Sequence, residues 1–422
     1  MKSFVLHNAS LQGRTGLWTV TVDHGRVSTI TPTPTDTTPT PDPHNTVHRV
    51  DLGGHLLLPG MVDIHIHLDK AYQLVQLEEL SSGRDPGIDA ALALSAQLRN
   101  TLTLDTIADN ARRVLDTLIS GGTVAARVHV EIGPNSDPAT VRMHRDLADE
   151  YPDLLLQLTA FAQYGTTTDP NALAQLEQAL DDGCSVVAGC PYADTDPIRH
   201  LDQMIALAKD RNLPLDLHLD LSDDPRALLL DEVVMRVEKA ELQGQVLVGH
   251  VTTLTALSPE RVRELATAAA GAGIAVAAIP STDLYLSGRT TDTAPTRGVT
   301  RIAELLDAHV PVCLASNNYE NAFTPVTMPS LTHAAWLASL TNHMGSTTAQ
   351  LKLLDAISAV PRTLLGPDVP GLAIGDVVGA AVFDTPSPVD VVRRAARPIA
   401  LVSAHHGLRA VDRTPADFTE GA

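Results

Sequence analysis

Two histidines at the end of an apolar segment are the first residues that could do chemistry. His65 and His67 stand two positions apart in a run that is otherwise rich in leucine, isoleucine and valine. Alternate side chains of a β-strand share a face, so both imidazoles would point one way while Ile64 and Ile66 pack on the other side. Two neutral imidazoles that converge in this way make half of a divalent metal site. The alternative is a pair of ordinary histidines, and the sequence downstream favours the metal site.

The downstream sequence has the pattern that would bring further ligands to this pair. From about residue 88 to about residue 364, helical periodicity alternates with short apolar strands, which is typical of repeated βα units. Strands are expected at residues 123–131, 154–161, 186–189, 215–220, 246–250, 274–279 and 310–316. With the histidine strand there are eight, and eight parallel strands close most naturally into a barrel whose active site lies at their carboxyl ends. The sequence therefore predicts an α/β protein with a (β/α)₈ barrel.

Both ends of the chain have a different pattern from the middle. Short β segments separated by turn residues precede the histidine strand and return after residue 364. We expect residues 1–54 and 365–422 to form one discontinuous β-sandwich domain beside a barrel of residues 55–364. A Thr/Pro/Asp tract at residues 31–44 is expected to form an exposed loop, since proline disfavours regular structure.

Composition limits the classes of partner. The chain of 422 residues has a net charge of −20 and no basic cluster, which argues against nucleic acid and anionic membranes. Three cysteines indicate a reducing compartment rather than a disulfide framework. No apolar run suggests a signal sequence or a membrane span, so a cytoplasmic location is expected. A small-molecule substrate is the expected partner, and a homo-oligomer stays an open alternative.

Several short motifs follow one another in order along the chain. They are His65-Ile66-His67-Leu68-Asp69, Arg127-Val128-His129-Val130-Glu131, Ala160-Phe161-Ala162-Gln163-Tyr164-Gly165, Leu217-His218-Leu219-Asp220, Gly249-His250-Val251-Thr252-Thr253 and Val312-Cys313-Leu314-Ala315-Ser316-Asn317-Asn318. In these motifs the chain resembles the amidohydrolase superfamily, in the branch of bacterial cytosine deaminase and isopropylammelide amidohydrolase. The likeness extends over nearly the whole sequence.

The resemblance implies a metal site at the mouth of the barrel. It makes His65, His67 and His218 ligands of one divalent metal, usually zinc or iron. It also places His250 beside the reacting water or substrate and Gln163 in the substrate pocket. Relatives with two metals use a lysine on the fourth strand, and residues 186–191 contain none, so one metal at most is expected.

Two positions depart from the family pattern. Asn317 stands where relatives have the metal-binding aspartate that deprotonates water, and Leu221 stands where they have a proton-carrying glutamate. An amide does not accept a proton near neutral pH and a leucine cannot transfer one. General acid–base catalysis contributes roughly 10² to 10⁴ in rate per group, so standard cytosine deamination is expected to fail. Because Asn317 also removes an anionic ligand, we expect the metal to be weakly held or absent.

Other groups could replace the missing base. Asp69, Asp220 and His250 are the candidates. The alternatives are that Asp69 caps the following helix and that Asp220 orients a ligand histidine. The residues expected to line the substrate pocket are His129, Gln163, Tyr164, Arg289, Asn317 and Asn318. Arg289 would bind a substrate anion, or else form an internal ion pair with Asp283.

Three functions are consistent with these residues. The first is a hydrolase that cleaves a C–N bond of a small, polar, cyclic nitrogen compound with metal-activated water. The second is a non-hydrolytic cyclase, lyase or dehydratase that needs little or no metal. The third is an inactive homologue that binds a small molecule. The fold by itself cannot choose between them.

Overall fold

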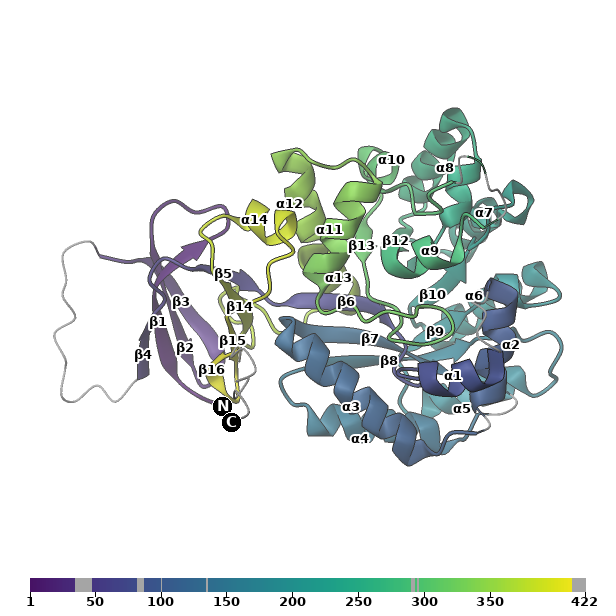
Figure 1. Ribbon diagram of the computed structural model, residues 1–422, viewed down its shortest axis with the longest axis horizontal. Coiled ribbons are helices and arrows are strands. Elements are labelled where there is room, and N and C mark those ends of the chain that lie inside the picture. The colour runs from purple at the N-terminus through teal and green to yellow at the C-terminus, as the bar shows by residue number, and fades with distance from the viewer. Residues whose placement is uncertain are drawn as a thin grey trace, which may run out of the picture.

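The computed structural model describes residues 1–34, 48–81, 87–99, 101–133, 136–289, 293 and 296–411. Most of the tract at residues 31–44, where a loop was predicted, lies outside these ranges. A large βα domain lies beside a smaller β domain that contains both ends of the described chain (Figure 1). No helix in the described ranges is long and apolar enough to cross a membrane.

The large domain is built on a sheet of eight parallel strands, which confirms the predicted barrel. The strands are β6 (Met61–Ile66), β7 (Thr123–Glu131), β8 (Leu155–Ala162), β9 (Val186–Gly189), β10 (Leu215–Leu219), β11 (Val246–His250), β12 (Ala275–Ala278) and β13 (Val312–Leu314). They pair in chain order, and a parallel bridge between Ile66 and Asn317 links the first strand to the segment after the last. The barrel is therefore nearly closed, and its two edges meet where the histidine strand β6 lies beside the segment that follows β13.

Helices alternate with the strands and cover the barrel. They are α1 (Leu74–Ser81), α2 (Ile88–Arg99), α3 (Leu104–Ser120), α4 (Ala139–Glu150), α5 (Ala172–Asp181), α6 (Pro197–Arg211), α7 (Leu230–Ala240), α8 (Pro259–Gly271), α9 (Pro280–Leu286), α10 (Ile302–Asp307), α11 (Leu331–Thr341), α12 (Thr347–Asp355) and α13 (Ala359–Leu365). The sequence explains α3 well. The Thr103 side chain accepts a hydrogen bond from the Thr106 N–H at its start, and Gly122, with a φ of 93°, follows its end. Its apolar stripe is buried against the barrel.

The small domain takes strands from both termini. Its strands are β1 (Phe4–Leu11), β2 (Trp18–Asp23), β3 (Arg26–Pro32), β4 (His48–Asp51), β5 (Leu56–Pro59), β14 (Gly379–Phe383), β15 (Ala400–Ser403) and β16 (Gly407–Ala410), and α14 (Pro388–Arg393) lies between two of them. The start of β1 pairs with β4 and its end pairs with β5. β5 also pairs with β14, so it belongs to the small domain. The next strand, β6, belongs to the barrel, and the chain therefore passes from one domain to the other at Gly60.

Candidate active site

The first strand delivers two neutral imidazoles to the inside of the barrel mouth. His65 lies in β6, His67 follows directly after it, and both are buried. Burial lowers the pKa of each imidazole well below its ordinary value, with His129 and Lys70 as the largest neighbouring influences on His65 and His67 respectively. Both side chains are therefore uncharged near neutral pH, which is the form that binds metals.

Three further histidines lie around this pair. His218 comes from β10, His129 from β7 and His250 from the end of β11. The His65 ring centre lies 4.1 Å from that of His129 and 4.3 Å from that of His218. The Nε2 atoms of His67 and His218 are 3.0 Å apart. Five histidines from four strands thus meet in one buried cluster.

A glycine makes this packing possible. A Cβ atom on Gly249 would lie 3.1 Å from Cε1 and 3.3 Å from Nδ1 of His65. Any side chain at this position of β11 would press on the His65 ring. The glycine therefore leaves room for the imidazole to lie against the neighbouring strand.

The histidine cluster has the donor set of a metal site. Both ring nitrogens of His65 and His129, and Nδ1 of His218, are buried without a hydrogen-bond partner among the described residues. One ligand atom from each of these three residues lies within 4.8 Å of the other two. Leaving a buried polar atom unpaired costs about 1–3 kcal/mol. Several unpaired imidazole nitrogens in one place are therefore typical of residues that are arranged to bind a cation. The residues present therefore fit a divalent metal.

The segment after β13 closes the barrel at the same place. The Asn317 N–H donates to the His65 carbonyl at 3.0 Å, and the His67 N–H donates to the Asn317 carbonyl at 2.9 Å. Asn317 has a φ of 67°, in the left-handed region that asparagine adopts more readily than other non-glycine residues. Its Nδ2 donates to Thr282 Oγ1 at 3.2 Å, and its Oδ1 is buried without a hydrogen-bond partner in the described part of the chain. Asn317 is therefore held at the mouth, with its side chain beside the histidines.

A histidine–aspartate pair lies next to Thr282, the residue that accepts the hydrogen bond from Asn317. Nδ1 of His250 is 2.8 Å from Oδ1 of Asp283, which lies in α9 and is fully buried. Burial raises the pKa of Asp283, and the interaction with His250 opposes this rise. The carboxylate fixes Nδ1 as the protonated nitrogen, so the lone pair is on Nε2. Asp283 is thus paired with His250, and the alternative ion pair between Asp283 and Arg289 was wrong.

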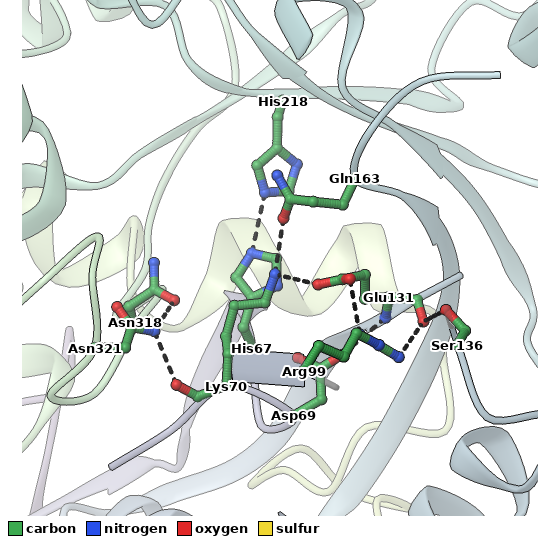
Figure 2. Close-up of polar contacts among 10 residues, drawn as sticks. All are labelled: His67, Asp69, Lys70, Arg99, Glu131, Ser136, Gln163, His218, Asn318 and Asn321. Atoms are coloured by element: carbon green, nitrogen blue, oxygen red, sulfur yellow. Dashed lines mark hydrogen bonds and ion pairs between the residues drawn. The ribbon is translucent and has the colours of Figure 1, made fainter. Parts of the chain in front are cut away.

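Lys70 is another residue that lines the mouth of the barrel. Its ammonium donates to Glu131 Oε2 at 2.9 Å and to Gln163 Oε1 at 2.7 Å (Figure 2). Arg99 lies on the far side of Glu131, with Nη1 at 2.9 Å from Oε1. The carboxylate therefore holds two cations, one of which reaches the cavity.

These groups surround a small cavity of about 20 Å³. Its polar lining consists of His67, Lys70, Gln163, Tyr192, His218, His250, Thr282, Asn317 and Asn318, and its apolar lining consists of Leu221, Leu286 and Phe323. A volume of this size holds about one water molecule. A substrate would need part of the wall to move.

Comparison with known proteins places the fold in a family. The pattern of the amidohydrolase family matches residues 90–360, which is more than half of the chain. The chain belongs to the amidohydrolase family. The expected family is therefore confirmed.

Three relatives match the sequence. The pterin deaminase of Rhizobium rhizogenes is 24% identical over 345 residues, covering 79% of this chain and 76% of the relative. The uncharacterized protein YahJ of Escherichia coli is 26% identical over 264 residues, covering 62% and 56%. The N-isopropylammelide isopropyl amidohydrolase of Pseudomonas sp. is 25% identical over 206 residues, covering 48% and 51%. The matches thus span little more than half the length of the last two relatives.

Solved structures of other amidohydrolase-like proteins have the same fold. The 5-methylcytosine deaminase of Klebsiella pneumoniae, bound to phosphonocytosine, superposes with a TM-score of 0.87 at 23% identity, covering 98% of this chain and 100% of that one. The N-isopropylammelide isopropylaminohydrolase of Burkholderia multivorans gives a TM-score of 0.78 at 20% identity, covering 96% and 97%. An adenosine deaminase of Xanthomonas campestris with bound zinc gives 0.70 at 15% identity, covering 99% and 95%. At these identities the likeness shows the fold.

Three of the predicted site residues point elsewhere in this amidohydrolase fold. Asp69 accepts a hydrogen bond from the Glu131 N–H at 2.9 Å and lies 3.6 Å from Arg99. Arg289 donates to the Tyr285 carbonyl from two nitrogens. Asp220 accepts from Leu229 N–H at 2.7 Å and from the Leu230 N–H at 3.1 Å, at the start of α7.

None of these three is among the described residues that line the cavity. The structure therefore brings together His65, His67, His129, Gln163, His218, His250, Asn317 and Asn318, but not Asp69, Asp220 or Arg289. Asp220 holds the start of α7, which neither of the two alternatives stated for it had predicted. Tyr164, also expected in the pocket, is absent from the described lining.

Sequence reasoning missed Lys70 as a cavity residue. It is one of only five lysines and comes three positions after His67. A lysine so close to a buried strand was the available signal, because a buried ammonium needs a partner and is seldom placed without one.

The buried carboxyl group of Asp220 should make the free energy of unfolding depend on pH. Burial raises its pKa from 3.8 to about 7, although the amide hydrogen bonds of α7 lower it. The folded chain then binds this proton more tightly than the unfolded chain, so the contribution to stability is fully present below about pH 4 and is lost as pH rises to about 7. A shift of about 3 units corresponds to at most about 4 kcal/mol.

We expect Asp220→Asn to remove this component, so that the difference in stability between variant and native protein changes between pH 4 and pH 7. Chemical denaturation across this range would show it. Asp210→Asn, at an exposed site on α6, is the matched control and should follow the native curve. An identical pH profile for Asp220→Asn and the native protein would contradict the prediction.

Proposed function

We propose that this protein hydrolyses a C–N bond of a small, polar, cyclic nitrogen compound with one divalent metal, zinc or iron, at the histidine cluster. The observation that carries this proposal is the set of buried imidazole nitrogens that lack hydrogen-bond partners at the carboxyl end of the barrel strands. Relatives named as deaminases and amidohydrolases support the reaction class.

The chain's own residues divide the work between binding and proton transfer. His65, His67 and His218 would hold the metal. When bound, the metal would act as a Lewis acid and lower the pKa of water. His250 is the candidate base, because Asp283 holds Nδ1 and leaves Nε2 to accept a proton at the cavity. This assignment fits a site in which Asn317 cannot act as a base.

Lys70 and Gln163 form the expected substrate anchor. Two of the three N–H donors of the Lys70 ammonium are used by Glu131 and Gln163, so among the described contacts one is left for a substrate. The same hydrogen bond orients the Gln163 amide, whose nitrogen can donate to a carbonyl or ring nitrogen. Leu221, Leu286 and Phe323 supply an apolar wall for a flat ring. These features favour a heterocycle with a carbonyl or carboxylate group.

The test begins with metal content and then screens for activity. Protein grown with zinc and iron should contain close to one metal per chain by elemental analysis. It should release ammonia or an amine from at least one compound in a panel of pyrimidines, pterins and triazines. Protein that contains no first-row metal and stays inactive on the panel would refute the proposal.

His250 provides a sharper test of the proton route. On the compound that native protein turns over, His250→Asn should lower kcat by about 10² to 10⁴ with little change in KM, as expected for loss of a general base. Asp283→Asn should also lower kcat, since it no longer fixes the tautomer of His250. His333→Asn, on α11 and not among the described residues that line the cavity, should keep native kinetics. A native kcat in His250→Asn would assign the base to another residue.

Lys70 also supports a second candidate, a non-hydrolytic lyase or cyclase. An ammonium in the cavity can donate a proton to a substrate without a metal, and the family carboxylates at positions 221 and 317 are absent. Turnover that survives complete removal of metal by a chelator would favour this candidate over the hydrolase.

A further inference from the structure

His129 occupies a place in the cluster that its predicted role does not explain. It was expected to contact substrate, yet it is fully buried and is not among the described residues that line the cavity. It belongs instead to the trio of His65, His129 and His218, whose ligand atoms all lie within 4.8 Å of one another. Its ring centre is 5.0 Å from that of His218 and 5.2 Å from that of His67.

A buried carboxylate lies behind the His129 ring. Nε2 of His129 is 3.3 Å from Oδ1 of Asp216, and neither atom has a hydrogen-bond partner elsewhere among the described residues. The other oxygen of Asp216 accepts from Nη1 of Arg127 at 3.0 Å, which anchors the carboxylate inside the barrel. The Arg127 side chain is buried as well, so the two groups form an ion pair inside the barrel.

This arrangement fixes the direction in which His129 can bind. A carboxylate near Nε2 favours the proton on that nitrogen, which leaves the lone pair on Nδ1. Nδ1 is buried, has no hydrogen-bond partner among the described residues and belongs to the ring that packs closest to His65. Metal-binding histidines commonly have such a carboxylate on the other ring nitrogen, where it orients the ring and makes it a stronger ligand.

We propose that His129 is a further metal ligand, which replaces the anionic ligand lost at Asn317, and that Asp216 positions it and supplies negative charge through it. The site would then consist of four imidazoles, from His65, His67, His129 and His218. The inference rests on the proposed function only in that a metal binds at this cluster. It moves the metal deeper into the barrel, toward β7, and frees Asn317 to contact substrate.

Zinc binding tests this assignment without any substrate. Zinc affinity is measured by competition with a chromophoric chelator, and X-ray absorption counts the imidazoles around the metal. Native protein should show four imidazoles. His129→Gln and His129→Phe should show one fewer and bind zinc at least about 10-fold more weakly, and Asp216→Asn should weaken binding by about 10-fold or more with the count unchanged.

A matched control separates loss of a ligand from loss of a buried histidine. His200 lies on α6, is fully buried and contacts Thr166 Oγ1 at 2.7 Å, away from the cluster. His200→Gln should bind zinc like native protein. Thermal unfolding of the metal-free proteins shows which variants fold, and His129→Phe retains a ring where His129→Gln leaves space. If neither folds, the imidazole count of native protein still decides.

Two negative results are distinguishable. Three imidazoles in native protein, or native zinc affinity in both His129 variants, would overturn the role of His129 while the proposed function stands. Native protein that binds no zinc or iron would overturn the role of His129 together with the proposed function.

Discussion

Changing His218 to alanine is expected to abolish metal binding and, with it, hydrolysis. His218 contacts two other histidines of the cluster closely, with its ring centre 4.3 Å from that of His65 and its Nε2 3.0 Å from that of His67. In the proposed function the metal has three histidine ligands, and a site that loses His218 keeps two of them, which is too few to hold the cation against water. Elemental analysis should fall from about one metal per chain to background, and His67→Ala should give the same result.

The control for these two variants is a buried histidine whose replacement leaves the cluster intact. His200→Gln is such a variant, and it should retain the native metal content. Near-native metal in both His218→Ala and His67→Ala would show that the metal lies elsewhere in the protein. Loss in the two cluster variants alone would tie the metal to the mouth of the barrel.

A gain of activity is the second large effect that we expect. Native protein should not deaminate cytosine above background, because positions 317 and 221 lack carboxylates. Asn317→Asp is nearly isosteric and puts an anion beside the histidines, where Thr282 can donate to it in place of the present hydrogen bond. We expect this change alone to tighten metal binding.

Proton delivery needs the second substitution. Leu221 lines the cavity and lies in an apolar cluster with Leu286 and Phe323. A glutamate there would have its pKa raised by burial, which suits a proton carrier near neutral pH, at a cost of a few kcal/mol of stability. Because water activation and proton delivery serve one reaction, neither change alone need give activity. The double variant should show weak hydrolysis of a cytosine-like or triazine-like ring.

The control for shape is Asn317→Asp combined with Leu221→Gln, which has a similar volume but no titratable group. It should stay at background when assayed by ammonia release. Metal affinity that does not respond to Asn317→Asp would mean that Asn317 is not close enough to the metal to serve as a ligand. Cytosine deamination by native protein at about 10 per second, a median enzyme rate, would show that the missing carboxylates are replaced in full.

The strands and helices of the barrel could be predicted from the sequence because each of them follows from a local pattern of residues. Apolar β runs alternate with amphipathic helices that end at glycines, and the predicted strand at residues 123–131 coincides with β7. Period-two alternation also indicated that His65 and His67 share a face, as do His129 and Glu131. Both pairs meet partners inside the barrel in the structure. The residue types and the strand faces were therefore readable from the sequence.

Only the tertiary structure decided where the side chains just after the strands point. Asp220 and His250 follow the same pattern at the ends of β10 and β11, and both have a positive φ, yet Asp220 turns to the start of α7 while His250 stays at the cavity. His250 meets Asp283 across 33 residues, and Lys70 meets Gln163 across 93. These pairings depend on the stagger between strands and on which helix N-terminus lies nearby. The stagger and the position of the helix N-terminus are set only when the barrel closes, so the spacing of residues along one strand does not encode them.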